Sequence, residues 1–191
     1  SLVRLQETDS LTAFRRDTSR QLKALARTGR PKLLTVNGRA AVVVQNAAAF
    51  EEMVDRLESL AGVARGLAAV QAGDHRPARS VFKQIGSDRR IPIRDLPGPH
   101  RWTSAAEIDE ATAWIQARNP EAARRWYWGL LAAIEGLGRL PHRHPVARTE
   151  SAHFGLVIRQ LVYGKGVGRY RVLYTVTERA VFVLHVGTAD A

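Results

Sequence analysis

The chain has 191 residues, 45% of them hydrophobic and 25% charged, which is ordinary for a globular protein. It contains no cysteine, so disulfides, thiol nucleophiles and thiolate metal sites are excluded. No apolar run approaches the ~20 residues that cross a bilayer, and no secretory signal pattern is present at the start. We therefore expect a cytoplasmic protein with no membrane partner.

The net charge of +11 is spread over both halves of the chain. Residues 1–84 carry 14 Lys and Arg against 8 Asp and Glu, and residues 85–191 carry 15 against 10. A basic surface of this kind attracts polyanions such as nucleic acids, with an affinity that falls steeply as the salt concentration rises.

The first predicted helix begins at Asp9 or Ser10, both good caps, and ends near Thr28 before Gly29. One face of this helix is apolar, and the opposite face holds a stripe of cations. Surface helices usually interleave acids with such cations, whereas Asp17 is the only acid inside this helix. The pattern favours a nucleic-acid contact over a merely solvated face. The stripe consists of Arg16, Arg20, Lys23 and Arg27.

A β-hairpin is predicted next. Residues 32–45 are rich in β-branched residues on both sides of Asn37-Gly38, a pair that supplies the two positive-φ positions of a type I′ turn. Helices are then predicted over about 46–60 and 62–72, followed by one or two amphipathic turns within 78–85.

The first 84 residues resemble the Phd/YefM antitoxin family. The order and spacing of the helix, the Gly-Arg-Pro stop, the Asn-Gly hairpin and the following helix all match that family. The matching segments are residues 10–18, 29–31, 34–44 and 47–51. The resemblance implies that residues 1–60 dimerise and bind operator DNA, and that residues 61–84 form a tail that binds a toxin.

The resemblance also assigns residues to these roles. It places Arg15 and Arg16 on DNA, and Arg39 is expected to replace the basic residue that the family often carries before the turn, where this chain has Val36. With the stripe, the expected DNA-binding residues are Arg15, Arg16, Arg20, Lys23, Arg27 and Arg39. The apolar residues expected to neutralise a toxin are Leu67, Val70, Val81, Phe82 and Ile85.

The second half is predicted to be a separate domain after a linker at residues 85–99, which are rich in Pro and Gly. Two antiparallel helices come first, and the second begins with Asn119 as its cap and Pro120 at its first position. Three strands follow, over about 156–163, 169–177 and 180–187.

Residues 100–191 resemble the RelE/ParE toxin family, whose fold is a helix pair followed by an antiparallel sheet. The motifs that carry the resemblance are Trp102-Thr103 and the segments 119–127, 158–164, 170–176 and 183–186. Some members of the family cut mRNA on the ribosome, and others poison DNA gyrase. We therefore expect an α+β protein of two domains, an antitoxin-like one and a toxin-like one.

Candidate catalytic residues follow from the same resemblance. Arg171 matches an arginine of the ribonuclease members, and Arg159 and Lys165 add charge that would stabilise a phosphorane. These cations form either a substrate patch or a surface for acidic antitoxin residues. No Arg, Lys or Tyr follows Arg179, although ribonuclease members carry a catalytic tyrosine there, so we expect weak or absent toxicity.

No cofactor and no metal site are expected. His142 and His144 flank an arginine in a proline-rich loop without an accompanying acidic cluster, which is typical of a surface loop and not of a zinc site. The sequence thus predicts a self-neutralised antitoxin–toxin fusion that binds operator DNA as a homodimer or higher oligomer. The alternatives are a latent toxin directed at mRNA or DNA gyrase, and a remnant that only oligomerises.

Overall fold

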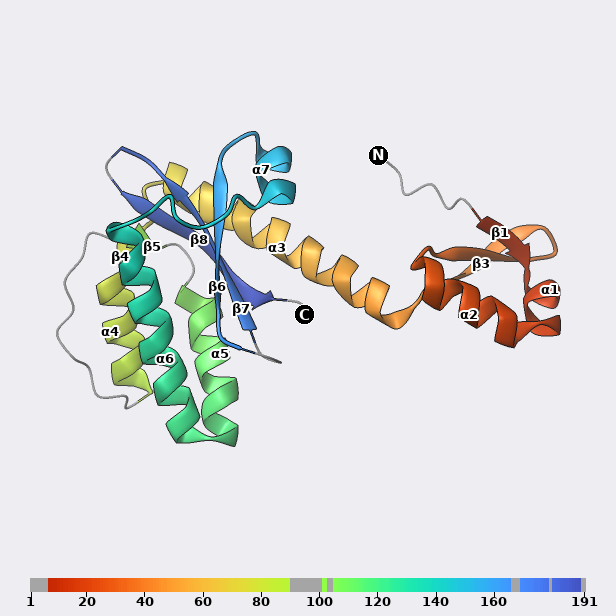
Figure 1. Cartoon of the computed structure of the whole chain (residues 1–191), viewed down its shortest axis with the longest axis horizontal. Helices are drawn as coiled ribbons and strands as arrows, with labels where there is room; N and C mark the ends of the chain where they lie inside the picture. The colour runs from red at the N-terminus through yellow and green to blue at the C-terminus, as the bar shows by residue number, and fades with distance from the viewer. Residues whose placement is uncertain (1–6, 90–100, 103–104, 166–168, 179, 190–191) are drawn as a thin grey trace. The chain divides into compact units, whose positions relative to one another are not determined.

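This computed structural model describes residues 7–89, 101–102, 105–165, 169–178 and 180–189. They form a mixture of α-helices and two β-sheets, which agrees with the expected α+β class. The chain divides into two compact units, residues 1–56 and residues 57–191, and each is described by itself (Figure 1). Within the described ranges, none of the helices combines the length and the apolar character that a membrane span needs.

The sheet of the first unit has three strands in the order β1-β2-β3. β1 (Glu7–Ser10) runs parallel to β2 (Lys32–Val36), which pairs antiparallel with β3 (Arg39–Val44). Asn37 and Gly38 have φ values of 50° and 75°, so the predicted type I′ turn is confirmed. Because β3 is the last strand in this order, it forms one edge of the sheet.

Two helices precede the hairpin, α1 (Leu11–Arg16) and α2 (Thr18–Thr28). The predicted cap at Ser10 is confirmed, because its hydroxyl accepts a hydrogen bond from the Ala13 N–H at 3.0 Å. The predicted stop is confirmed too, because Gly29 is left-handed at φ 64° and closes the last turn of α2.

The prediction of one continuous helix from residue 10 to residue 28 is wrong at its centre. Asp17 has φ −138° and ψ 50°, which lie outside the helical region, so the chain starts a new helix at Thr18. The Thr18 hydroxyl donates to the Phe14 carbonyl at 3.2 Å, a side-chain bond that competes with the regular helical pattern.

Polar side chains connect α2 to the sheet of the first unit. The Gln21 amide donates to a carboxylate oxygen of Asp9 at 3.2 Å and accepts from the Lys32 ammonium group at 2.6 Å. Leu25 of α2 and Leu34 of β2 are both buried. These contacts fix the face of α2 that carries Gln21 and Leu25 against the sheet.

A single helix, α3 (Ala47–Gln71), follows the hairpin where two helices were predicted. Gly62 lies in its interior without breaking it. A glycine costs about 1 kcal/mol relative to alanine inside a helix, and close packing against the His185 ring explains why one stands here. The first part of α3, to residue 56, belongs to the first unit and the remainder to the second.

The sheet of the second unit has five strands in the order β4-β5-β8-β7-β6. Three of them are the predicted antiparallel strands, β6 (Ile158–Tyr163), β7 (Arg169–Val176) and β8 (Val181–Ala189). The other two are short, β4 (Arg76–Pro77) and β5 (Arg101–Trp102), and β5 runs parallel to β8.

Helices cover both faces of this sheet (Figure 1). On one face lie α4 (Ala78–Asp88) and the predicted helix pair, α5 (Ala105–Arg118) and α6 (Pro120–Glu135), which share a core with Val172 and Tyr174 of β7. The second part of α3 and the short α7 (Arg148–Phe154) pack on the other.

The predicted beginning of the second helix of the pair is confirmed. The Asn119 side chain accepts a hydrogen bond from the Ala122 N–H at 2.9 Å, and Pro120 occupies the first turn. A short 3₁₀ turn, Gly136–Gly138, follows α6 directly, and its central residue Leu137 is buried.

The predicted linker at residues 85–99 is wrong over its first residues. α4 continues through Asp88, because Ile85 extends the buried apolar side that Val81 and Phe82 begin. Arg89 caps the helix and forms two hydrogen bonds to the Asp109 carboxylate of α5, at 2.9 and 2.8 Å. The rest of the predicted linker lies outside the described residues.

Candidate functional site

The basic residues predicted to bind DNA are exposed on three elements of the first unit. Arg15 and Arg16 lie in the last turn of α1, and Arg39 begins β3. On α2, Arg20, Lys23 and Arg27 follow one another at spacings of three and four residues, which places them along one helix face.

The break at Asp17 corrects the predicted stripe. Arg16 belongs to α1 and does not continue the row formed by Arg20, Lys23 and Arg27. Arg20 and Asp17 approach to 3.9 Å, but both are largely exposed, and such a pair contributes at most about 1 kcal/mol. The exposed basic side chains that precede the hairpin therefore come from two separate helices, α1 and α2.

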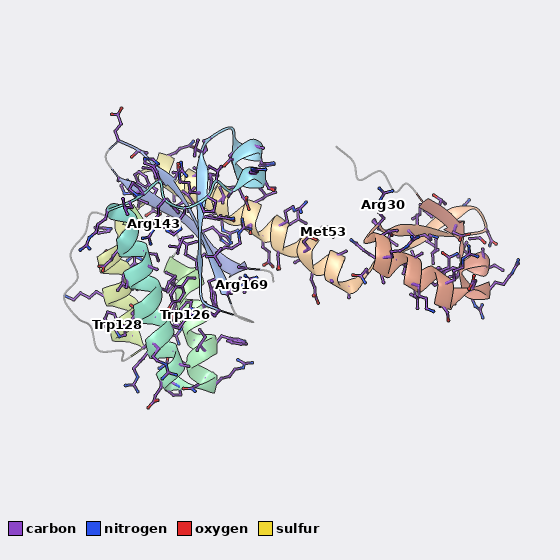
Figure 2. All side chains as sticks on the ribbon, viewed as in Figure 1. Arg30, Met53, Trp126, Trp128, Arg143 and Arg169 are labelled. Carbon is purple, nitrogen blue, oxygen red and sulfur yellow. The ribbon has the colours of Figure 1, made fainter. Side chains whose placement is uncertain are left out.

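Apolar side chains are also exposed in the first unit. About half of the surface of Val42 and Val43 on the edge strand β3 and of Phe50 on α3 is accessible. Met53, labelled on α3 in Figure 2, is exposed as well. An edge strand with apolar side chains is a surface that proteins usually cover.

The predicted catalytic arginine Arg171 of β7 is held by neighbouring side chains. Its guanidinium group lies 3.0 Å from a carboxylate oxygen of Glu150 on α7, and its Nε donates to the Gln160 side chain at 3.1 Å. The Glu150 side chain is only 4% exposed and that of Arg171 is 24% exposed. The pair fastens α7 to the sheet.

Arg159 of β6 forms hydrogen bonds to the backbone of the loop that contains His142 and His144. One of its terminal nitrogens donates to the carbonyl oxygens of His142 and His144, at 3.1 and 2.7 Å. Because side chains alternate along a strand, Arg159 lies on the α6 face with Leu161, and Gln160, the partner of Arg171, lies on the other face. The third predicted residue, Lys165, is exposed just after β6. Arg171 and Arg159, the two predicted catalytic arginines, therefore lie on opposite faces of the sheet and are not brought together.

The five predicted neutralising residues lie inside the second unit, on opposite faces of its sheet. Leu67 and Val70 of α3 are half-buried beside Leu173 and Leu184. Val81, Phe82 and Ile85 of α4 are buried in the core shared with the helix pair, where the Tyr127 hydroxyl of α6 donates to the Phe82 carbonyl. Burial raises the pKa of Tyr127 above its ordinary range.

Two glycines that the sequence analysis did not single out let α3 approach β8 closely. A Cβ on Gly62 would overlap the His185 ring, and a Cβ on Gly66 would fall within 2.8 Å of the Leu184 Cα. The pairing of β7 with β8 is irregular at this point, because Leu173 pairs with His185 and Tyr174 with Val183, so Leu184 is an extra residue in β8. The spacing of the two glycines by one helical turn was the signal in the sequence.

A second feature missed from the sequence is the concentration of charge in residues 139–148, which we call the basic loop. It carries three arginines and two histidines and no acid. Arg143, labelled in Figure 2, donates to the His144 ring at 2.9 Å. Burial, and then the charge of Arg143, lower the pKa of His144 below its ordinary value.

Among the described residues, no group of three His, Asp or Glu side chains is arranged to hold a metal ion. No protein-family model matches this chain, and no curated protein matches it at a significant level.

Proposed function

We propose that the chain is a fused antitoxin–toxin module. In this proposal the first unit binds operator DNA as a dimer, and the toxin-like second unit is neutralised by residues 57–88 of the same chain. The resemblances to the Phd/YefM and RelE/ParE families motivate the assignment. The observation that carries it is the position of α4 and the second part of α3, which cover both faces of the second sheet.

The DNA-binding part of the proposal is supported by exposed cations on α1 and α2 and by the exposed apolar side chains of β3 and α3. Arginine and lysine side chains in solvent are available to phosphate groups, and covering Val42, Val43 and Phe50 would favour a dimer. A dimer would present two copies of the basic helices, as a two-fold operator requires.

Absence of killing activity is supported by two further observations. The predicted catalytic arginines are engaged in structure, Arg171 with a buried carboxylate and Arg159 with two loop carbonyls. A cation that already neutralises Glu150 contributes less positive potential to a reacting phosphate. The segments that cover the sheet belong to the same chain, so their local concentration remains high at any expression level.

The experiment compares growth, translation and DNA supercoiling in bacteria that express the whole chain or its Gly66→Ala variant. An added methyl group cannot fit against the Leu184 backbone, so this variant should loosen α3 from the sheet. Ala68→Gly, a change at an exposed position of the same helix, is the control. We expect no growth arrest from any of the three chains.

The latent-toxin alternative makes the opposite prediction for the loosened chain. If masking alone prevents toxicity, Gly66→Ala should arrest growth while Ala68→Gly should not, and Arg171→Ala added to Gly66→Ala should relieve the arrest. Arrest by the whole unmodified chain would contradict neutralisation by residues 57–88 altogether.

A further inference from the structure

The basic loop of the second unit carries several basic side chains and no acidic one. Between Glu135 and Glu150 the sequence contains no acidic residue. Glu150 does not offset the charge of the loop, because its carboxylate is buried against Arg171. The exposed basic side chains of the loop are Arg139, His142, Arg143 and Arg148.

Hydrogen bonds from the sheet hold this loop in place. Arg159 binds the carbonyl oxygens of His142 and His144, and the Tyr174 hydroxyl donates to the Pro141 carbonyl at 2.7 Å. The last part of the loop adds a backbone bond to β6, from the Gln160 N–H to the Pro145 carbonyl at 3.0 Å. A backbone that is already ordered loses little conformational entropy when its side chains bind a ligand.

We propose that the basic loop is a second nucleic-acid contact, which binds the phosphate groups of duplex DNA without reading its sequence. The guanidinium group matches the geometry of a phosphate and stays charged at all relevant pH values. In the part of the chain that the structure describes, no ion pair engages Arg139, Arg143 or Arg148. Arg139, Arg148 and the terminal nitrogens of Arg143, whose Nε donates to His144, are therefore available to an external anion.

The residue types of the loop favour a duplex over a single strand. Proteins that bind single strands without sequence preference stack the bases on aromatic side chains. Residues 136–150 contain no Phe, Tyr or Trp, and the nearby Tyr174 is buried. The contact is additional to the operator binding proposed for the first unit and does not depend on it.

The test measures binding of the whole chain to a labelled duplex of about 30 base pairs with mixed sequence, by fluorescence anisotropy over a series of salt concentrations. The variants are Arg139→Ala/Arg143→Ala and a matched control, Arg124→Ala/Arg125→Ala. The control removes the same charge from exposed positions on α6. The loop variant should bind more weakly, and the slope of log affinity against log salt should decrease by about two in magnitude, at about 0.9 for each lost phosphate contact.

Two results would overturn the proposal. One is a loop variant whose affinity and salt slope equal those of the α6 control. The other is a whole chain whose loop-dependent binding is to single-stranded RNA of the same length and not to the duplex. Thermal unfolding of both double variants checks that the substitutions leave the fold intact.

A third variant, Arg15→Ala/Arg16→Ala, separates this contact from operator binding. If the loop variant loses mixed-sequence binding while the Arg15/Arg16 variant still binds its own upstream DNA like the parent, the loop contact stands and the proposed function fails. If the loop variant behaves like its control while the Arg15/Arg16 variant loses that DNA, the loop contact fails and the proposed function stands.

Discussion

At the scale of single residues, the sequence identifies Arg171 as a candidate catalytic residue but does not reveal its partner Glu150. In the sheet, Arg171 lies on the opposite face of β7 from the half-buried Tyr170 and the buried Tyr174. Its partner Glu150 is 21 positions away on α7, a helix of seven residues that carries no strong periodic signal. A contact of this kind between distant segments is fixed by tertiary packing, which local patterns do not encode.

Replacement of Glu150 by glutamine should destabilise the second unit. The substitution retains the shape of the side chain but removes the charge that faces Arg171 in a buried position, at a cost of about 1.5–3 kcal/mol for a hydrogen bond with charged partners. Chemical denaturation of the whole chain measures the change in the free energy of unfolding. Glu121→Gln is the control, since Glu121 and Arg125 are 3.8 Å apart and exposed. Equal changes in the free energy of unfolding would show that the buried Glu150–Arg171 pair stabilises the fold no more than the exposed Glu121–Arg125 pair.

At the level of elements, the prediction was best where a short signal acts locally. Asn37-Gly38, Ser10 and Asn119 each fix a turn or a helix start through their own backbone or side chain, and all three behave as predicted. The helix over residues 47–71 was predicted as two, over about 46–60 and 62–72, with the division next to Gly62. Close packing against His185 explains that glycine, and its spacing from Gly66 by one helical turn is the local trace of this packing.

The pH dependence of stability tests the hydrogen bond within the basic loop. His144 accepts from Arg143 only while its ring is neutral, and its pKa lies below the ordinary value of about 6.5 that we assume for the unfolded chain. The unfolded chain therefore takes up this proton first as the pH falls, so the free energy of unfolding should decrease below about pH 6.5. His144→Gln, which keeps an acceptor but does not titrate there, should lose less stability between pH 7.5 and 5. Parallel curves for the two chains would contradict this assignment.

For the whole molecule, the proposed function requires the first unit to dimerise, and its exposed apolar side chains are the surface that we expect a partner copy to cover. We expect light scattering to give a mass of at least twice 21.1 kDa at micromolar concentration. Val42→Lys/Phe50→Lys should shift the protein toward the monomer, because charged side chains are costly to bury in an interface. Val157→Lys/Val162→Lys places the same charges at exposed positions of the second unit and should not. A monomeric mass for the unmodified chain would contradict the proposed dimer.

Operator binding is the central claim, and its most direct test is titration of the DNA upstream of the chain's own gene with the whole protein at several salt concentrations. The parent should bind this DNA more tightly than a scrambled duplex of equal length. Arg15→Ala/Arg16→Ala should bind it more weakly, with a salt slope smaller by about one for each arginine. Arg124→Ala/Arg125→Ala should retain the preference for the upstream DNA. Binding by the Arg15/Arg16 variant that equals the parent, in affinity and in slope, would contradict the account.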